Sequence, residues 1–377
     1  MNQRLYVATR KGLFVLAPDA SASPAGETTW TIQSRSFLGN PVTIVFPDDR
    51  HGVVYAALEL GHFGVKLHRS TDGCATWHES PCPEYPERPA DATDVDPFRK
   101  EPVPWTVKKI WALAGGGADA PDRLWCGTIP GGLFVSEDRG ESWSLVRSLW
   151  DNPARAEWFG GGYDWPGIHS ICVDPRDSNV VRVGVSCGGV WQSNDAGANW
   201  KCVADGMRAA YVPPEQANSG HIQDPHLIAQ CPNEPDIFWA QHHNGIFVTE
   251  NACESWQEVK EPAVSDFGFA VVVHPVDGNT AWFVPGIKDD MRIPVDAKLV
   301  VTRTKDGGKS FSDLRNGLPQ SDAYGIVYRH AMDVAADGSH LAFGTTTGSL
   351  FVTNNGGDDW QRVSADLPPI YDVQFAG

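Results

Sequence analysis

The 377-residue sequence predicts an all-β chain folded as a seven-bladed β-propeller. Three observations lead to this prediction. An octapeptide of fixed spacing recurs along the chain, short strand-like runs accompany each copy, and the last residues supply one strand that the first unit lacks. Repeats of this length, with four short strands in each, are typical of propeller blades.

The octapeptide has the spacing Ser/Thr-x-Asp/Asn-x-Gly/Cys-x-x-aromatic. Six copies can be read: STDGCATW (70–77), SEDRGESW (136–143), SNDAGANW (193–200), TENACESW (249–256), TKDGGKSF (304–311) and TNNGGDDW (353–360). A seventh, degenerate unit surrounds Trp30, where a longer Ala/Ser/Pro-rich loop replaces the turn. The aromatic residues of successive units lie 47 to 66 residues apart, which fits one blade per unit.

Each residue type in the octapeptide has a local role in a hairpin. The Asp side chain accepts backbone N–H bonds across the turn, the Gly permits a positive φ, and the aromatic side chain packs between neighbouring blades. Asn251 and Asn355 replace the Asp, and Cys74 and Cys253 stand where Gly is usual. We therefore expect these variant turns to be held mainly by packing.

Both ends of the chain contribute to the first predicted blade. Residues 1–36 begin at the second strand of a unit, and the C-terminal PPIYDVQFAG supplies a surplus innermost strand. Joining 368–377 to 1–36 completes blade one and closes the ring without an open sheet edge. We expect residues 1–377 to form a single domain.

Composition limits the partners. A net charge of −17 argues against nucleic acid and against an anionic membrane surface, because both attract basic proteins. The N-terminus has no charged-then-apolar leader, and no apolar run is long enough to span a membrane. The eight Cys are scattered with no Cys-x-x-Cys pair, so we expect reduced thiols, a cytoplasmic location and a small-molecule or saccharide ligand. Nothing in the sequence indicates an oligomeric state.

The predicted topology places the octapeptides on one rim and the candidate functional residues on the opposite face. That face receives the loops that enter each first strand and those that join the second strand to the third. First-strand starts carry Lys108, His169, His226, Asp266, Arg329, His330 and Tyr371. Second-strand ends carry Arg10, Lys11, Glu59, His242, His243 and Asn244, and the KDDMRIP stretch carries Asp289, Asp290 and Arg292. The long loops 78–107, 144–168 and 201–225, rich in aromatic residues, Gly and Pro, are expected to form the walls of a pocket.

Two subsets of these residues point to chemistry. His169, His226 and His243 come from the fourth and fifth blades, and three imidazoles around one point bind Zn or Mn. The alternative is that each His donates a hydrogen bond to a loop carbonyl.

Arg10, Arg292 and Arg329 come from blades one, six and seven, and Arg forks suit an anionic group. The alternative for these arginines is ion pairing with Asp266, Asp289, Asp290 or Asp372.

With these motifs, the chain resembles the bacterial BNR/Asp-box repeat proteins of the sialidase-like superfamily, in particular cytoplasmic seven-bladed members with an ATRKGLFVL start and LPP near the end. The resemblance covers the whole chain and implies a label of glycosyl hydrolase or exo-α-sialidase. Sialidases, however, have six blades and a Phe/Tyr-Arg-Ile-Pro motif before the first box. Here MRIP (291–294) lies in the sixth blade without the aromatic residue, so we do not expect sialidase activity. Xyloglucanases also carry Asp-boxes, but they use two propeller domains.

Two functions of different class follow. The first is a carbohydrate-active enzyme for an anionic sugar or related small carboxylate, either glycoside hydrolase-like or a metal-assisted lyase or isomerase. Asp266, Asp290 and Glu59 are its acid/base candidates, and Tyr371 or His330 is the base in the lyase form. The candidates for substrate binding are Arg10, Lys11, Lys108, Arg292, Arg329, His242 and Asn244. The alternative is a non-catalytic ligand-binding or assembly-factor propeller, and we favour the enzyme.

Overall fold

The structure, a computed structural model, describes residues 3–19, 29–262 and 264–376 in two compact units. Its fold class is the predicted one, an all-β seven-bladed propeller, because the strands form seven four-stranded antiparallel sheets. The first unit comprises residues 1–60, 68–79 and 261–377, and the second comprises 61–67 and 80–260. The single-domain organisation of the chain stays a prediction.

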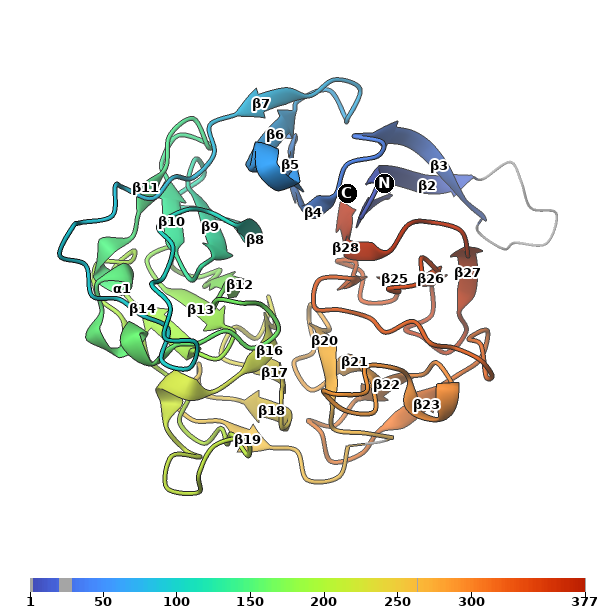
Figure 1. Cartoon of the computed structure of the whole chain (residues 1–377). Helices are drawn as coiled ribbons and strands as arrows, with labels where there is room; N and C mark the ends of the chain where they lie inside the picture. The colour runs from blue at the N-terminus through green and yellow to red at the C-terminus, as the bar shows by residue number, and fades with distance from the viewer. Residues whose placement is uncertain (1–2, 20–28, 263, 377) are drawn as a thin grey trace. The chain divides into compact units, whose positions relative to one another are not determined.

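Blade 1 of the first unit has the strand order β28-β1-β2-β3, so the C-terminal strand does join the N-terminal blade, as predicted. Figure 1 shows the two chain ends beside each other in this sheet. Its strands are β1 (Arg4–Thr9), β2 (Gly12–Asp19), β3 (Thr29–Ser36) and β28 (Ile370–Ala376). The Ala/Ser/Pro-rich loop predicted between the second and third of these lies outside the described residues.

Two further sheets lie wholly in the first unit. Blade 6 has β20 (Gly268–Val273), β21 (Ala281–Pro285), β22 (Val301–Thr304) and β23 (Ser312–Leu314), with the short helix η4 (Val295–Ala297) before its third strand. Blade 7 has β24 (Met332–Val334), β25 (Leu341–Gly344), β26 (Leu350–Thr353) and β27 (Gln361–Ser364). Blade 2 has the order β4-β5-β6-β7, with β4 (Val42–Asp48), β5 (Val53–Glu59), β6 (Val65–Ser70) and β7 (His78–Ser80).

The second unit contains three complete blades. Blade 3 has β8 (Lys109–Gly115), β9 (Leu124–Ile129), β10 (Leu133–Ser136) and β11 (Ser144–Leu145). Blade 4 has β12 (Ile168–Val173), β13 (Val181–Val185), β14 (Gly189–Ser193) and β15 (Lys201–Cys202). Blade 5 has β16 (Pro225–Gln230), β17 (Phe238–His242), β18 (Gly245–Thr249) and β19 (Gln257–Glu258). The loops of the second unit contain four short helices: η1 (Gly61–Phe63), α1 (Arg147–Trp150), η2 (Pro153–Glu157) and η3 (Gly220–Ile222).

The octapeptide turns are held by the hydrogen bonds that the sequence predicts. The Asp195 carboxylate accepts from the backbone N–H of Asn199 at 2.8 Å, and the Ser193 hydroxyl accepts from the backbone N–H of Gly197 at 2.8 Å. The expectation that the variant turns rely mainly on packing is corrected. The side-chain oxygen of Asn251 accepts from the backbone N–H of Ser255 at 3.1 Å, because an amide oxygen can replace a carboxylate oxygen here.

Packing between adjacent blades supplies the core of each unit. In the second unit, the aromatic residue of one octapeptide turn, Trp256 of blade 5, is buried and donates a hydrogen bond of 2.8 Å to the carbonyl of Val203 in blade 4. All eight cysteines lie within the described residues, and none forms a disulfide. Among the described residues, every helix is too short or too polar to cross a membrane.

Candidate functional site

The first strands of the second unit share an irregularity that orients three side chains. The register with the second strand shifts between Ile110 and Ala112 in blade 3, between Ile168 and Ser170 in blade 4, and between Pro225 and Leu227 in blade 5. A β-bulge changes the direction of a side chain. The residues at the three shifts are Trp111, His169 and His226.

Within the described part of the chain, His226 belongs to a group of three His and Asp side chains whose spacing could hold a metal ion, which we call the Asp224 cluster: Asp224, His226 and His243. One ligand atom from each residue lies within 4.8 Å of the other two. Oδ2 of Asp224 is 3.5 Å from Nε2 of His226 and 3.5 Å from Nδ1 of His243. Asp224 and His226 are buried, whereas the side chain of His243 is 21% exposed, so the cluster is open on the His243 side.

Hydrogen bonds from blade 4 and from the main chain fix the position of Asp224. Its Oδ1 accepts from the backbone N–H of Cys187 at 3.0 Å and from the hydroxyl of Ser186 at 3.3 Å. Its carbonyl accepts from the backbone N–H of His243 at 2.9 Å, which ties the two cluster residues together. These hydrogen bonds hold the Asp224 side chain and the backbone of the cluster in place.

His242, a predicted substrate-binding residue, contacts the backbone at Asp224 and at Asn244. Its ring is fully buried, and the backbone N–H groups of Asp224 and Asn244 each lie 3.0 Å from one of its nitrogens. Burial lowers the pKa of His242 to about 3, so the ring is neutral at neutral pH and accepts one of these bonds at a time. Asn244, also predicted to bind substrate, instead uses its side-chain oxygen to accept from the backbone N–H of Ala210 at 2.7 Å.

Two loops bring aromatic residues and a glycine to the cluster. The ring of Tyr211 meets that of His243 edge-on at 5.1 Å, and Phe159 lies 6.3 Å from Tyr211. Burial of the phenol group and the nearby Asp224 carboxylate both raise the pKa of Tyr211. At Gly161 a Cβ would lie 2.6 Å from Sγ of Cys187 and 3.5 Å from Oδ2 of Asp224, so only glycine lets the loop approach this closely.

The same loop meets a buried cation of blade 3. Nζ of Lys109 donates to the hydroxyl of Tyr163 at 2.9 Å and lies 5.0 Å from the centre of its ring. The ring of Tyr163 packs edge-on against Trp111, which packs edge-on against His169. The loops 144–168 and 201–225 therefore contribute aromatic side chains on this side of the unit, and the pocket that they are expected to enclose stays a prediction.

Two of the predicted residues in this unit lie elsewhere than expected. His169 does not belong to the Asp224 cluster. Its Nδ1 lies 2.8 Å from the hydroxyl of Ser170, and its ring packs on Trp111. Lys108 is exposed just before β8 begins, and its neighbour Lys109, the first residue of that strand, is the buried lysine.

The predicted residues of the first unit form a separate set. The guanidinium groups of Arg292 and Arg329 each lie 5.4 Å from the ring centre of Phe269, so blades 6 and 7 bring these two arginines to one ring. Arg292 also pairs with the carboxylate of Asp289, which matches the ion-pair alternative, and Lys288 pairs with Asp290 at 3.1 Å. The remaining predicted residues are exposed or half-buried, and their roles stay predictions: Arg10, Lys11, Glu59, Asp266, His330 and Tyr371.

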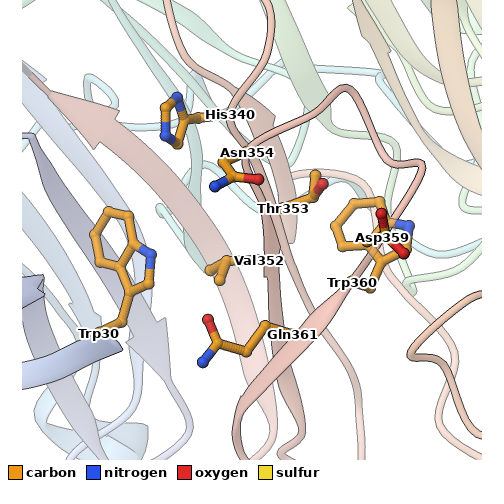
Figure 2. Close-up of a pocket in the computed structure, with 8 residues that line it drawn as sticks. All are labelled: Trp30, His340, Val352, Thr353, Asn354, Asp359, Trp360 and Gln361. Atoms are coloured by element: carbon orange, nitrogen blue, oxygen red, sulfur yellow. The ribbon is translucent and has the colours of Figure 1, made fainter. Parts of the chain in front are cut away.

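Two cavities lie among the described residues away from the Asp224 cluster. One, of about 290 Å³, lies in the first unit beside the octapeptide turn of blade 7; Figure 2 shows Trp30 and Trp360 at its two sides with the amides of Asn354 and Gln361 between them. The other, of about 300 Å³, lies in the second unit and includes Tyr85 and Trp105. The second is lined mostly by residues of the predicted wall loop 78–107, but neither contains a predicted catalytic, substrate-binding or metal-binding residue. The cluster contains His226 and His243 and is therefore the better functional candidate.

Sequence reasoning missed four residues of the site: Asp224, Lys109, Tyr163 and Gly161. The signal for Asp224 was present in QDPHLIAQ, where an acidic residue stands two positions before His226. The contact of Gly161 with Asp224 had no local signal, because it depends on the path of a loop.

No family model matches the chain. Among curated proteins, it is 24% identical over 278 residues to an oligoxyloglucan-reducing end-specific xyloglucanase of Emericella nidulans and 31% identical over 271 residues to a probable enzyme of that name from Neosartorya fischeri. Each match covers 66% of this chain but 31% of the relative, so the chain spans about a third of their length. It is also 22% identical over 347 residues to the photosystem II assembly lipoprotein Ycf48 of a Synechococcus species, a match that covers 91% of this chain and 80% of that protein.

Solved structures give the same two kinds of neighbour. The GH74 xyloglucanase of Xanthomonas campestris superposes with a TM-score of 0.61 at 17% identity, over 97% of this chain and 53% of its own. YCF48 of Cyanidioschyzon merolae superposes with a TM-score of 0.51 at 12% identity, over 87% of each chain. At these identities the likeness establishes the β-propeller fold that the enzymes and the assembly factor share with this chain.

Proposed function

We propose that the chain is a carbohydrate-active enzyme for an anionic saccharide or a related small carboxylate, with the Asp224 cluster as its reacting centre. The observation that carries this proposal is a buried carboxylate held 3.5 Å from each of two imidazoles. Burying ionisable groups costs folding free energy, and such groups gather where chemistry needs them.

A saccharide suits the surroundings of the cluster. Tyr211 and Tyr163 are exposed aromatic residues on the two loops that approach it, and flat rings of this kind bury the apolar face of a sugar while their hydroxyl groups stay in polar contact. The buried Lys109 ammonium supplies a positive charge for an anionic sugar. The similarity to proteins named as xyloglucanases supports a saccharide as the substrate.

Elimination or isomerisation fits the cluster better than hydrolysis. Hydrolysis by the usual route needs two carboxyl groups on either side of the scissile bond, whereas the cluster has one carboxylate and two imidazoles. In an elimination, a base takes the proton next to the sugar carboxylate, the C–H electrons form a C=C bond, and the glycosidic C–O bond breaks as its oxygen leaves with a proton from an acid. The reaction requires a positive centre that holds the sugar carboxylate and a base within reach of that proton.

The test is a survey of oligosaccharides that contain uronic or sialic acids, with the unsaturated product followed by its ultraviolet absorbance and hydrolysis followed by released reducing ends. We expect turnover by the intact chain that Asp224→Asn, His226→Gln and His243→Gln each reduce by at least about 100-fold, as loss of a catalytic group does. His221→Ala is the control, because His221 pairs with Glu157 and stacks on Trp191 outside the cluster. Turnover that all three cluster variants retain would refute the assignment of the reacting centre.

A second candidate, a non-catalytic binding or assembly propeller, is favoured by one observation. The similarity to the assembly lipoprotein Ycf48 extends over most of both chains, which the xyloglucanase matches do not. This function predicts that the chain leaves every saccharide unchanged while a ligand still raises its thermal unfolding temperature.

Membership of the sialidase-like superfamily, with the octapeptides as Asp-boxes, belongs to the same proposal. It is supported by the hydrogen-bonded Ser-x-Asp turns such as that of Ser193 and Asp195.

A further inference from the structure

We propose that Asp224, His226 and His243 hold one divalent transition-metal ion, with Zn²⁺ as the probe of this class. The inference rests on the proposed function only in that both use the same cluster, and metal binding can be measured with no substrate. It also revises the ligand set expected from the sequence, because the third ligand is the Asp224 carboxylate in place of His169.

Two of the three separations between ligand atoms fit a shared ion. Zinc binds imidazole nitrogen at about 2.0–2.1 Å and carboxylate oxygen at about 2.0–2.2 Å, so two ligands of a tetrahedral ion lie about 3.4 Å apart. Oδ2 of Asp224 is 3.5 Å from Nε2 of His226 and 3.5 Å from Nδ1 of His243. These separations are too long for strong hydrogen bonds and match two edges of such a tetrahedron.

Hydrogen-bond donors around the Asp224 carboxylate fix its orientation, as the neighbours of metal-binding carboxylates usually do. Oδ1 of Asp224 accepts from the Cys187 N–H and the Ser186 hydroxyl, which directs Oδ2 towards the two imidazoles. The hydrogen bond from the backbone N–H of His243 to the carbonyl of Asp224 fixes two of the ligands relative to each other. Partners of this kind raise metal affinity because the site does not have to be ordered on binding.

The electrostatics also favour a cation. With both imidazoles neutral, the negative charge of a buried carboxylate has no full compensation inside the cluster; with both protonated, two cations share one carboxylate oxygen. One divalent ion bound to two neutral imidazoles and one carboxylate leaves a net positive charge at the cluster. That charge is what the carboxylate of an anionic saccharide needs.

Among the three ligands, His243 is the one that reaches solvent. Asp224 and His226 are buried, and the loop at Gly161 passes close to the Asp224 carboxylate. The side chain of His243 is partly exposed beside Tyr211. Three protein ligands leave coordination positions for water or substrate, as in catalytic zinc sites. When bound, the ion would polarise a sugar carboxylate and acidify the neighbouring proton.

The experiment uses the full chain, stripped with a chelator and dialysed into metal-free buffer. Titration with ZnCl₂ by calorimetry, with elemental analysis of the desalted complex, should give one bound ion per chain. His226→Gln and His243→Gln should each weaken binding by about 100-fold or more, since even loss of a supporting group costs about 10- to 100-fold. Co²⁺ in place of Zn²⁺ should give visible absorption bands that change in Asp224→Asn.

His221→Ala is the matched control, since it removes a histidine of the same unit outside the cluster, and it should bind Zn²⁺ like the unmodified chain. Thermal unfolding of every variant without metal establishes that it is folded. Equal Zn²⁺ affinity in the control and in folded cluster variants, or less than one ion per folded chain, would overturn the metal site. A chain that binds one ion through the cluster but transforms no saccharide would retain the site and refute the proposed activity.

Discussion

Oδ2 of Asp372 accepts a hydrogen bond of 2.7 Å from the backbone N–H of Val45, which joins the innermost strand of blade 1 to that of blade 2. In the second unit, the Ser170 hydroxyl accepts from the backbone N–H of Ile228 at 3.1 Å, between blades 4 and 5. Both acceptors directly follow a residue at which the register of their strand shifts. In both strands, the residue after the irregularity accepts a hydrogen bond from the neighbouring blade.

The carboxyl group of Asp372 should make the first unit less stable as the pH rises. Burial raises the pKa of Asp372 to about 7, and burial likewise raises that of Asp333 to about 6, where Asp333 accepts from the backbone N–H of Phe375. Both values exceed the ordinary value of 3.8, so folding favours the protonated groups. Their contribution to stability is complete below about pH 4 and is lost as the pH rises through 6 and 7, at roughly 1.4 kcal/mol per pKa unit.

We expect Asp372→Asn to reduce this loss, because an amide oxygen still accepts from Val45 and carries no charge to bury. Chemical unfolding at pH 5 and pH 8 measures it: the variant should gain stability relative to the unmodified chain at pH 8. Asp366→Asn, which removes an exposed carboxylate of the same unit, should leave the difference between the two pH values unchanged. A larger loss of stability in Asp372→Asn at pH 8 than at pH 5 would contradict the assignment.

The octapeptide turns should respond to acid in the opposite sense. Hydrogen bonds from the side chain and backbone of Asn199 lower the pKa of Asp195, so its contribution is present above its unfolded pKa near 4 and is lost as the pH falls below that value. Asp195→Ala should destabilise the chain at pH 7, because it removes the hydrogen bonds of the turn, as the loss of a capping side chain does.

Asp195→Asn separates the charge from the hydrogen bond. The natural turn at Asn251 shows that an amide oxygen makes the same bond, so this variant should be nearly as stable as the unmodified chain at pH 7 and less sensitive to acid. Thermal unfolding at pH 7 and pH 3 distinguishes the two variants. If Ala and Asn destabilise the turn equally at pH 7, the side-chain oxygen is not what holds it.

The sequence predicted the fold better than the site. Seven sheets and the pairing of the last strand with the first could be predicted because each depends on a repeated local pattern, and the octapeptide fixes where each hairpin lies. His226 and His243 could be assigned to one place because strand ends of a single blade must meet. The exclusion of His169 from the cluster could not be predicted, since spacing along the chain does not show which way a side chain at a strand irregularity points.

The adjacent lysines of blade 3 provide a paired test of the anionic substrate. Lys109 is buried with its ammonium on Tyr163, whereas Lys108 is exposed, although the sequence alone favoured Lys108. Lys109→Met keeps the side-chain length and removes the charge. With an anionic saccharide we expect KM to rise about tenfold, equivalent to about 1.4 kcal/mol of binding free energy.

Lys108→Met should leave KM unchanged, because an exposed ammonium interacts weakly with a bound anion. Steady-state kinetics with an acidic saccharide and its neutral methyl ester complete the comparison: only the acid should distinguish Lys109→Met from the unmodified chain. Equal effects on acid and ester would mean that Lys109 supports the fold of the loop and not the charge of the substrate.

Neighbouring glycines in the loop over the Asp224 cluster give the sharpest test of its geometry. A Cβ at Gly161 would lie 2.6 Å from Sγ of Cys187, closer than side chains pack, while a Cβ at Gly162 has no heavy atom within 4 Å. Neither residue has a positive φ, so alanine strains the backbone at neither position and the two variants differ only in what the methyl group meets.

Gly161→Ala must displace either the loop or Cys187, whose N–H holds the Asp224 carboxylate. We expect Gly161→Ala to weaken Zn²⁺ binding by about tenfold, because it displaces a group that supports a ligand without removing the ligand. Gly162→Ala should bind Zn²⁺ like the unmodified chain. Calorimetric titration of both variants measures this, and equal affinities would show that the loop does not determine the position of the carboxylate.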